Sequence, residues 1–204
     1  MRRSWLHGWL TALTILASLA GAAKAADATP SAVITKFQGA LIEAMKDAKT
    51  LGVKGRYDRL VTPIDDTFNM RLMSGISAAS HWKEASDAQR TRLTDAFRRM
   101  SVATLAAMAT GYSGQTFEVL GEKAGPQGTV IVDTRLVDTD GSKISIAYVG
   151  RQFDGRWRFI DLIVDNGISE LKTRQSEYAR TLQDSGIEGL IALLDTKSNE
   201  ILTK

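Results

Sequence analysis

The feature that most constrains the fold is a change of hydrophobic period near Gly111. After it, apolar side chains recur at every second position over four segments, 116–122, 129–137, 143–153 and 157–164. This alternation is typical of strands. Asp140-Gly141 and Asp154-Gly155 separate the last three segments, and Asp-Gly pairs favour the tight turns of β-hairpins. The last three strands are therefore predicted to form an antiparallel meander.

The first half of the chain has helical patterns instead. Thr29-Pro30 is typical of a helix start, with a capping side chain before a proline. Gly52 and Gly55 are expected to end this first helix. Apolar residues on one face of it recur at four-residue intervals: Val33, Phe37, Leu41 and Met45.

Further helices are predicted on both sides of the strands. Two short ones cover 57–64 and 69–76, and Ser86 to Gln89 has the form of a capping box that opens a long helix. Two helices over 169–183 and 187–202 close the chain, with a break at Gly186. This order predicts an α+β fold: an antiparallel four-stranded curved sheet packed by several helices, with a helical annex. Such a layer can enclose a cavity.

The N-terminal segment resembles an export signal. Arg2 and Arg3 precede an uncharged apolar stretch, and Ala23-Lys24-Ala25 has the small-x-small form of a cleavage site. The apolar core, about 9–20, is shorter than the ~20 residues of a membrane-spanning helix. We therefore expect a cleaved signal peptide, 1–25, rather than a membrane anchor, followed by a single domain over 26–204.

The positive charge of the chain belongs to this segment. The whole sequence has 26 Lys and Arg against 23 Asp and Glu, and Arg2, Arg3 and Lys24 account for the excess. The remaining chain is formally neutral, so the basic pI gives no argument for nucleic-acid binding. Cysteine is absent, which excludes a disulfide within the fold.

Few catalytic constellations fit this composition. His81 is the only histidine after the N-terminal segment, and most metal sites and nucleophile–base pairs need more such groups. Ser169 to Lys172 matches S-x-x-K, but the companion S-D-N and K-T-G motifs are missing. A serine at a helix start is an ordinary N-cap. We predict no catalytic residue, no metal and no cofactor.

Several motifs follow one another in a fixed order over 26–204. They are the helix that starts at Pro30, D-x-T-F-N-M around Phe68, Trp82 followed by S-x-x-Q-x-x-x-L-x-x-A-F at 86–97, Tyr112-Ser-Gly, and then Trp157, Asp161, Gly167, Ser169, Arg174, Tyr178 and Gly186. This ordered set resembles the MlaC-type (toluene-tolerance, Ttg2-like) family of periplasmic lipid-binding proteins. The insert at 51–60, together with 167–171, is similar to its hopanoid-biosynthesis-associated (HpnM) branch.

The resemblance implies an NTF2-like or cystatin-like body with an apolar cavity for lipid tails. It also implies a periplasmic carrier that takes a hopanoid or phospholipid between an inner-membrane transporter complex and an outer-membrane acceptor. A two-chain lipid has about 30 methylenes, each costing ~0.8 kcal/mol to expose to water. Such a lipid therefore needs a carrier to cross an aqueous compartment.

Large apolar residues that face the gap between helices and sheet are the candidates for lining this cavity, although each can equally be ordinary core. They are Phe37, Leu41, Met45, Phe68, Leu72, Met73, Phe97, Met100, Val130, Val132, Ile144, Ile146, Tyr148 and Phe159. Arg98-Arg99 is interpreted as a solvated helix face that can also contact a lipid headgroup or an acidic partner.

Two other functions stay open. A small isomerase or dehydratase on the same kind of body would use Asp161 or His81 in an apolar pocket, with a shifted pKa. A lipid-free module that regulates an envelope complex would need no cavity. In the carrier interpretation, Asp161 is instead an ion-pair partner and Ser169 a helix cap.

Overall fold

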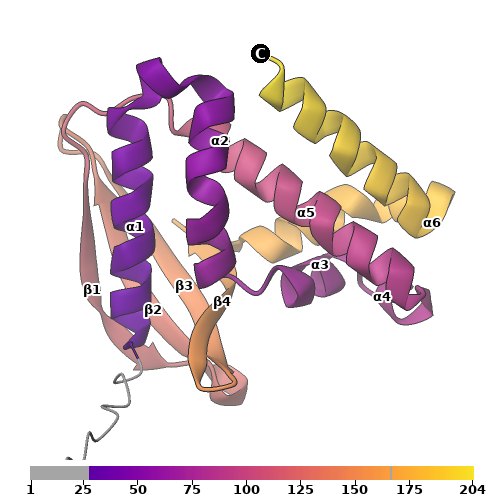
Figure 1. The fold of residues 1–204 in the computed structure, drawn as a ribbon. Coiled ribbons are helices and arrows are strands. Elements are labelled where there is room, and N and C mark those ends of the chain that lie inside the picture. Colours follow the sequence, from indigo (N-terminus) through magenta and orange to yellow (C-terminus); the bar gives the residue numbers. More distant parts are fainter. Residues whose placement is uncertain (1–27, 166) are drawn as a thin grey trace, which may run out of the picture.

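The computed structural model describes residues 28–165 and 167–204. The predicted signal peptide, 1–25, lies outside these residues. The described chain forms five antiparallel strands in the order β1-β2-β3-β4-β5, with helices before and after them (Figure 1). The strands are β1 (Thr116–Ala124), β2 (Val130–Val137), β3 (Lys143–Phe153), β4 (Arg156–Val164) and β5 (Ile168–Ser169).

The predicted meander is confirmed, and the turns follow the Asp-Gly pairs. Asp154 and Gly155 form the whole connection between β3 and β4, with φ of 50° and 75°. Positive φ at both positions matches the right-handed twist of a hairpin, and Asp and Gly tolerate it. The predicted count of four strands is wrong by one, because β5 pairs with Ile163 and Val164 over only two residues. Two residues are too short to show a period.

The N-terminal helices differ from the prediction. α1 (Pro30–Lys46) is capped by the Thr29 side chain, as expected, but it ends before Gly52. α2 (Ala48–Thr67) begins directly after Asp47 and contains both glycines and the predicted helix 57–64. Gly52, with φ of 60°, kinks α2, since glycine adopts the left-handed region without steric cost. Gly55 is helical.

The remaining helices follow their caps. Asn69 caps α3 (Met70–Ala78), α4 (His81–Glu84) is a single turn, and the capping box of Ser86 and Gln89 opens α5 (Asp87–Met108). Ser169 caps α6 (Glu170–Leu202), which is broken at Gly186, as predicted. Every helix of the described chain lacks an apolar stretch long enough to cross a bilayer.

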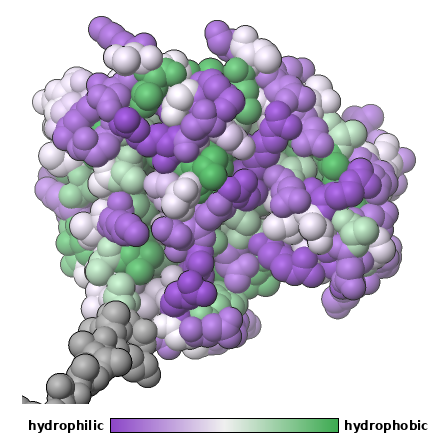
Figure 2. All heavy atoms as spheres, in the orientation of Figure 1, coloured by the Kyte–Doolittle hydropathy of each residue, from purple (hydrophilic) through white to green (hydrophobic). Residues whose placement is uncertain are grey.

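Helices cover one side of the sheet and extend beyond it. α1 packs on β1 and β2, while α2, α3 and α6 contact β4 (Figure 1). α3, α5 and α6 pack on one another and form the helical annex. One buried core joins the annex to the sheet, from Leu194 of α6 to Val132 of β2. Hydrophilic residues dominate the face seen in Figure 2, and apolar residues appear there in separate patches.

Candidate functional site

The helix-facing side of the sheet, called the inner face here, is defined by the strand register. Val132 of β2 pairs with Tyr148 of β3, and both are fully buried beneath the helices. Because side chains alternate along a strand, their neighbours two and four residues away share this face. These are Val130, Thr134 and Leu136 of β2, opposite Gly150, Ile146 and Ile144 of β3.

Four rings fill the covered part of the inner face and form the aromatic cluster. Phe37 comes from α1, Phe68 from the link between α2 and α3, Tyr148 from β3 and Phe159 from β4. The ring centroids are 5.1 Å apart for Phe37 and Phe68, and 6.0 Å for Tyr148 and Phe159, both edge to face. Such contacts stabilise aromatic pairs beyond their area burial. The interior is closed at this point, and an acyl chain there requires the rings to part.

A glycine and a backbone pairing position these rings. A Cβ at Gly150 would lie 2.8 Å from a ring carbon of Phe159, so only glycine lets this ring lie over β3. Phe68 forms a parallel bridge with Phe159, and the Asn69 N–H donates to the Phe159 carbonyl (2.9 Å). The link between α2 and α3 is thereby fixed to the edge of β4.

One polar group of α1 enters this apolar interior. The Gln38 side-chain amide donates to the hydroxyls of Thr134 (3.2 Å) and Tyr148 (3.4 Å), and all three side chains are buried. Thr134 in turn donates to the Ile146 carbonyl (2.9 Å). Burial raises the pKa of Tyr148 to about 12, because the phenolate is disfavoured away from water. The cluster is therefore neutral at physiological pH.

Coverage of the inner face ends toward the turn between β2 and β3. Tyr148 is buried, Ile146 is half-buried and Ile144 is 40% exposed. Val119 of β1, on the same face, is 39% exposed. α1 runs in this direction, since Ser31 bonds Glu122 and Gln38 bonds Thr134. The partly exposed apolar side chains here define the open end: Met45, Tyr112, Val119, Leu136 and Ile144.

The structure divides the predicted lining residues into two groups. Those on the inner face, on α1 or on the link between α2 and α3 are Phe37, Leu41, Met45, Phe68, Val130, Val132, Ile144, Ile146, Tyr148 and Phe159. The others, Leu72, Met73, Phe97 and Met100, lie on α3 and α5, whose main neighbours include α6. Met100, for example, accepts a hydrogen bond at its sulfur from Ser198 of α6 (3.7 Å).

The residues of the enzymatic alternative have structural contacts. The Asp161 carboxylate accepts from the Ser169 hydroxyl (2.6 Å) and from the backbone N–H groups of Leu162 (2.8 Å) and Leu171 (3.1 Å). Asp161 therefore fixes the start of α6, and among the described residues it forms these hydrogen bonds in place of the expected ion pair. Ser169 is the predicted cap, because its hydroxyl accepts from the Lys172 N–H (3.1 Å). His81 is half-buried on α4.

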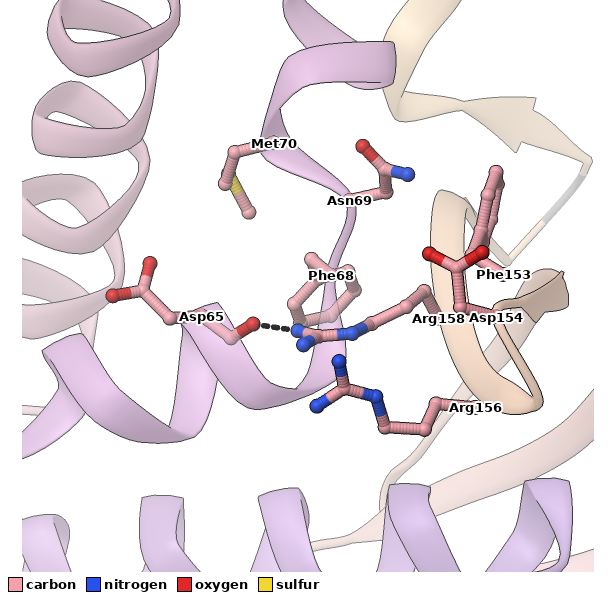
Figure 3. A pocket seen from close by; sticks show the side chains of 8 residues that line it. All are labelled: Asp65, Phe68, Asn69, Met70, Phe153, Asp154, Arg156 and Arg158. Atoms are coloured by element: carbon pink, nitrogen blue, oxygen red, sulfur yellow. Dashed lines mark hydrogen bonds between the residues drawn. The ribbon is translucent and has the colours of Figure 1, made fainter.

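A hollow of about 310 Å³ lies at the edge of β4, beside the tip of its hairpin (Figure 3). Its lining residues are Asp65, Phe68, Asn69, Met70, Phe153, Asp154, Arg156 and Arg158. Arg158 donates to the backbone carbonyl of Asp65. The two carboxylate oxygens of Asp65 accept from Nε and Nη2 of Arg98, and this hydrogen bonding raises the pKa of Arg98.

Sequence reasoning missed Arg156 and Arg158 and pointed to Arg98 and Arg99 instead. In the structure Arg98 is bound to Asp65, and Arg99 bonds Asn199 of α6. The signal that was available is Arg-x-Arg directly after the Asp-Gly turn, because alternate residues of a strand point to one side.

A second hollow, of about 380 Å³, lies on the outer face of the sheet. Its lining residues with outward-facing side chains include Lys123, Asp133, Ser145, Ala147 and Ile163. Lys123 and Asp133 form an ion pair within it (2.6 Å). Nowhere in the described residues do three His, Cys, Asp or Glu side chains gather as a metal site requires.

Known proteins match this architecture. The sequence profile of the MlaC protein family matches residues 35–196. The chain belongs to the MlaC family. A phospholipid-binding protein from Ralstonia solanacearum, solved in complex with a phospholipid, is 18% identical to this MlaC-family chain. The match covers 86% of this chain and 99% of the other, with a TM-score of 0.73. The predicted α+β fold, with an antiparallel sheet packed by helices, is confirmed by this likeness.

Proposed function

We propose that this MlaC-family protein carries a lipid through the periplasm, with the hydrocarbon tails between the inner face of the sheet and helices α1 and α2. The observation that carries the proposal is the inner face itself. It stays largely apolar from the buried Val132 and Tyr148 to the open end, where Val119 and Ile144 are exposed. Exposed apolar side chains that continue a core are typical of ligand-binding grooves.

The closed aromatic cluster sets the physical condition for carriage. Burial of its two tails lowers the free energy of a two-chain lipid by more than about 20 kcal/mol, because the tails leave water. Parting four rings costs their mutual contacts, about 0.5–1.5 kcal/mol for each pair beyond the buried area, and the tails replace much of that area. The balance favours a protein that closes when empty and opens around its cargo.

The proposed cargo is a hopanoid or a phospholipid, delivered between an inner-membrane transporter complex and an outer-membrane acceptor. The insert at 51–60 supports the hopanoid branch through its resemblance, and the phospholipid in the Ralstonia solanacearum protein supports the other cargo. Cleavage of the predicted signal after Ala25 would release the carrier in the periplasm. Native mass spectrometry of protein purified from its own periplasm tests both the cargo and the cleavage.

A matched pair of variants tests the location of the tails. Ile144→Asp places a charge at the open end of the inner face, and Leu120→Asp places the same charge on an exposed side chain beside the outer hollow. We expect Ile144→Asp to lose the co-purifying lipid while Leu120→Asp retains it, because a charge is costly next to hydrocarbon. Equal retention by both variants contradicts the proposed location.

The alternatives give different outcomes. A small enzyme would lose turnover in Asp161→Asn, whereas a carrier keeps its lipid and loses only stability at the start of α6. A lipid-free interaction module would give a clean apo mass in repeated preparations. The hydrogen bonds of Asp161 to backbone and Ser169 favour the structural role, so the carrier remains the proposal.

A further inference from the structure

We propose that the hollow beside β4 is a phosphate site, in which Arg156 and Arg158 hold the phosphate of the cargo lipid. Only the lipid source of the phosphate rests on the proposed carrier function. The charges of the hollow support a phosphate site by themselves. A lipid that carries phosphate is then oriented with its headgroup at the hairpin between β3 and β4 and its tails along the inner face.

The hollow carries uncompensated positive charge. Arg156 forms no ion pair with any described residue, and Arg158 donates to a backbone carbonyl, which leaves its charge unneutralised. Two carboxylates, Asp65 and Asp154, also line the hollow, but Arg98 already binds Asp65 from outside it. The hollow therefore retains one net positive charge together with free guanidinium N–H groups.

The strand also places the two arginines together. Arg156 and Arg158 are alternate residues of β4, and both guanidinium groups point into the space in front of Phe68 (Figure 3). Planar guanidinium groups bind phosphate oxygens in pairs, which an ammonium cannot do. α3 begins at Met70 on the same rim, and the positive end of its dipole adds to the attraction for an anion.

Phe68 lies between the hollow and the apolar interior. Its ring lines the hollow and also belongs to the aromatic cluster, 5.1 Å from the ring of Phe37. A charged compartment and the apolar interior are therefore separated by one side chain. This pairing matches an amphipathic ligand that has an anionic head and hydrocarbon tails, whereas a soluble metabolite would need only the charged half.

Binding of two lipids that differ only at the phosphate tests this assignment. The probes are phosphatidylglycerol and a diacylglycerol with the same acyl chains, added to the full-length protein, and inorganic phosphate followed through the arginine Nε–H signals in NMR. The variant is Arg156→Gln, which leaves the Arg158 bond to Asp65 in place. The control is Arg151→Gln, on the same hairpin, whose side chain lies over Phe153 and outside the hollow.

We expect the unaltered protein to prefer phosphatidylglycerol by about tenfold or more, as one charge-assisted contact would give. Arg156→Gln should remove this preference and leave diacylglycerol binding unchanged, while Arg151→Gln keeps it. A preference that survives in Arg156→Gln overturns the phosphate site but leaves the carrier function standing.

The phosphate titration separates the two proposals. If neither lipid binds the unaltered protein, the carrier function fails, and the titration alone decides the site. A shift of the Arg158 Nε–H signal on addition of phosphate that is lost in Arg156→Gln then assigns the hollow to a soluble phosphate. The absence of any shift, with no lipid preference, overturns the site for both sources.

Discussion

The buried end and the open end of the inner face are made by the same strands. At the buried end Val132, Tyr148 and Phe159 are almost fully shielded, whereas at the open end Val119 and Ile144 are about two-fifths exposed. The alternation of side chains is the same at both ends. Burial is therefore set by what covers the strands, and the protein leaves apolar surface accessible where α1 ends.

The largest contrast is expected from a charge placed at each end. Val132→Asp buries a carboxylate at a site with 0% exposure, and we expect a loss of more than about 4 kcal/mol in the free energy of unfolding. Ile144→Asp keeps the carboxylate in contact with water and should cost under about 1 kcal/mol. Urea denaturation followed by circular dichroism measures both. Similar losses would show that the two ends are packed alike.

Removal of a ring gives the next largest effect. Phe159→Ala takes out the ring that lies over Gly150 and should cost about 3–5 kcal/mol, as large core truncations do. Ile144→Ala at the open end should cost less than about 1 kcal/mol, because the side chain is only partly covered. A small cost for Phe159→Ala would indicate a loose cluster. The same denaturation experiment decides between these outcomes.

Alkaline pH should weaken the fold at two buried tyrosines, Tyr148 of the aromatic cluster and Tyr178 of α6. Burial raises the pKa of Tyr148 and of Tyr178 to about 12, against about 10 for an unfolded tyrosine. Folding favours the neutral phenol, so each contribution is complete below pH 10 and is lost as the pH rises from 10 to 12. It amounts to about 2–3 kcal/mol for each tyrosine.

Unfolding free energies measured between pH 8 and pH 12 test this dependence. Tyr148→Phe removes one titrating group and should show a smaller alkaline loss than the unaltered protein. Ile144→Ala removes none and should show the full loss. An unchanged profile in Tyr148→Phe contradicts the assignment of this loss to the aromatic cluster.

The smallest effect is expected where the buried end passes into the open end. Thr134→Val removes an acceptor of Gln38 and a donor to the Ile146 carbonyl, and we expect a cost of about 1–2 kcal/mol. Ser145→Ala, next along β3 from Ile146 but exposed on the outer face, should change stability by less than about 0.5 kcal/mol. Equal values for the two variants would mean that the Gln38 contacts do not stabilise the fold.

Local signals predicted most of the fold. The Asp-Gly pairs located the hairpins, and Thr29, Ser86 with Gln89, and Ser169 located helix starts, because turns and caps depend on neighbouring residues. Gly52 was misjudged as a helix end, since its sequence shows a break but not whether one helix kinks or two helices meet. β5 was missed because two residues carry no pattern.

The site depends on contacts between distant residues and was predicted less well. Phe37, Phe68, Tyr148 and Phe159 were each chosen for size and position, but their convergence requires the Gly150 approach and the pairing of Phe68 with β4. The hollow joins Asp65 to Arg158 across the chain. No local pattern encodes that meeting, so Arg156 and Arg158 were not selected from the sequence.

Phe68 stands on a link of two residues between α2 and α3. One side of its ring lines the hollow with the arginines of β4, and its ring also contacts those of Phe37 and Tyr148. A single side chain thus separates the solvent-accessible polar hollow from the water-excluded interior. Any replacement at this position changes the hollow and the interior together, so the access of water to the interior depends on this one residue.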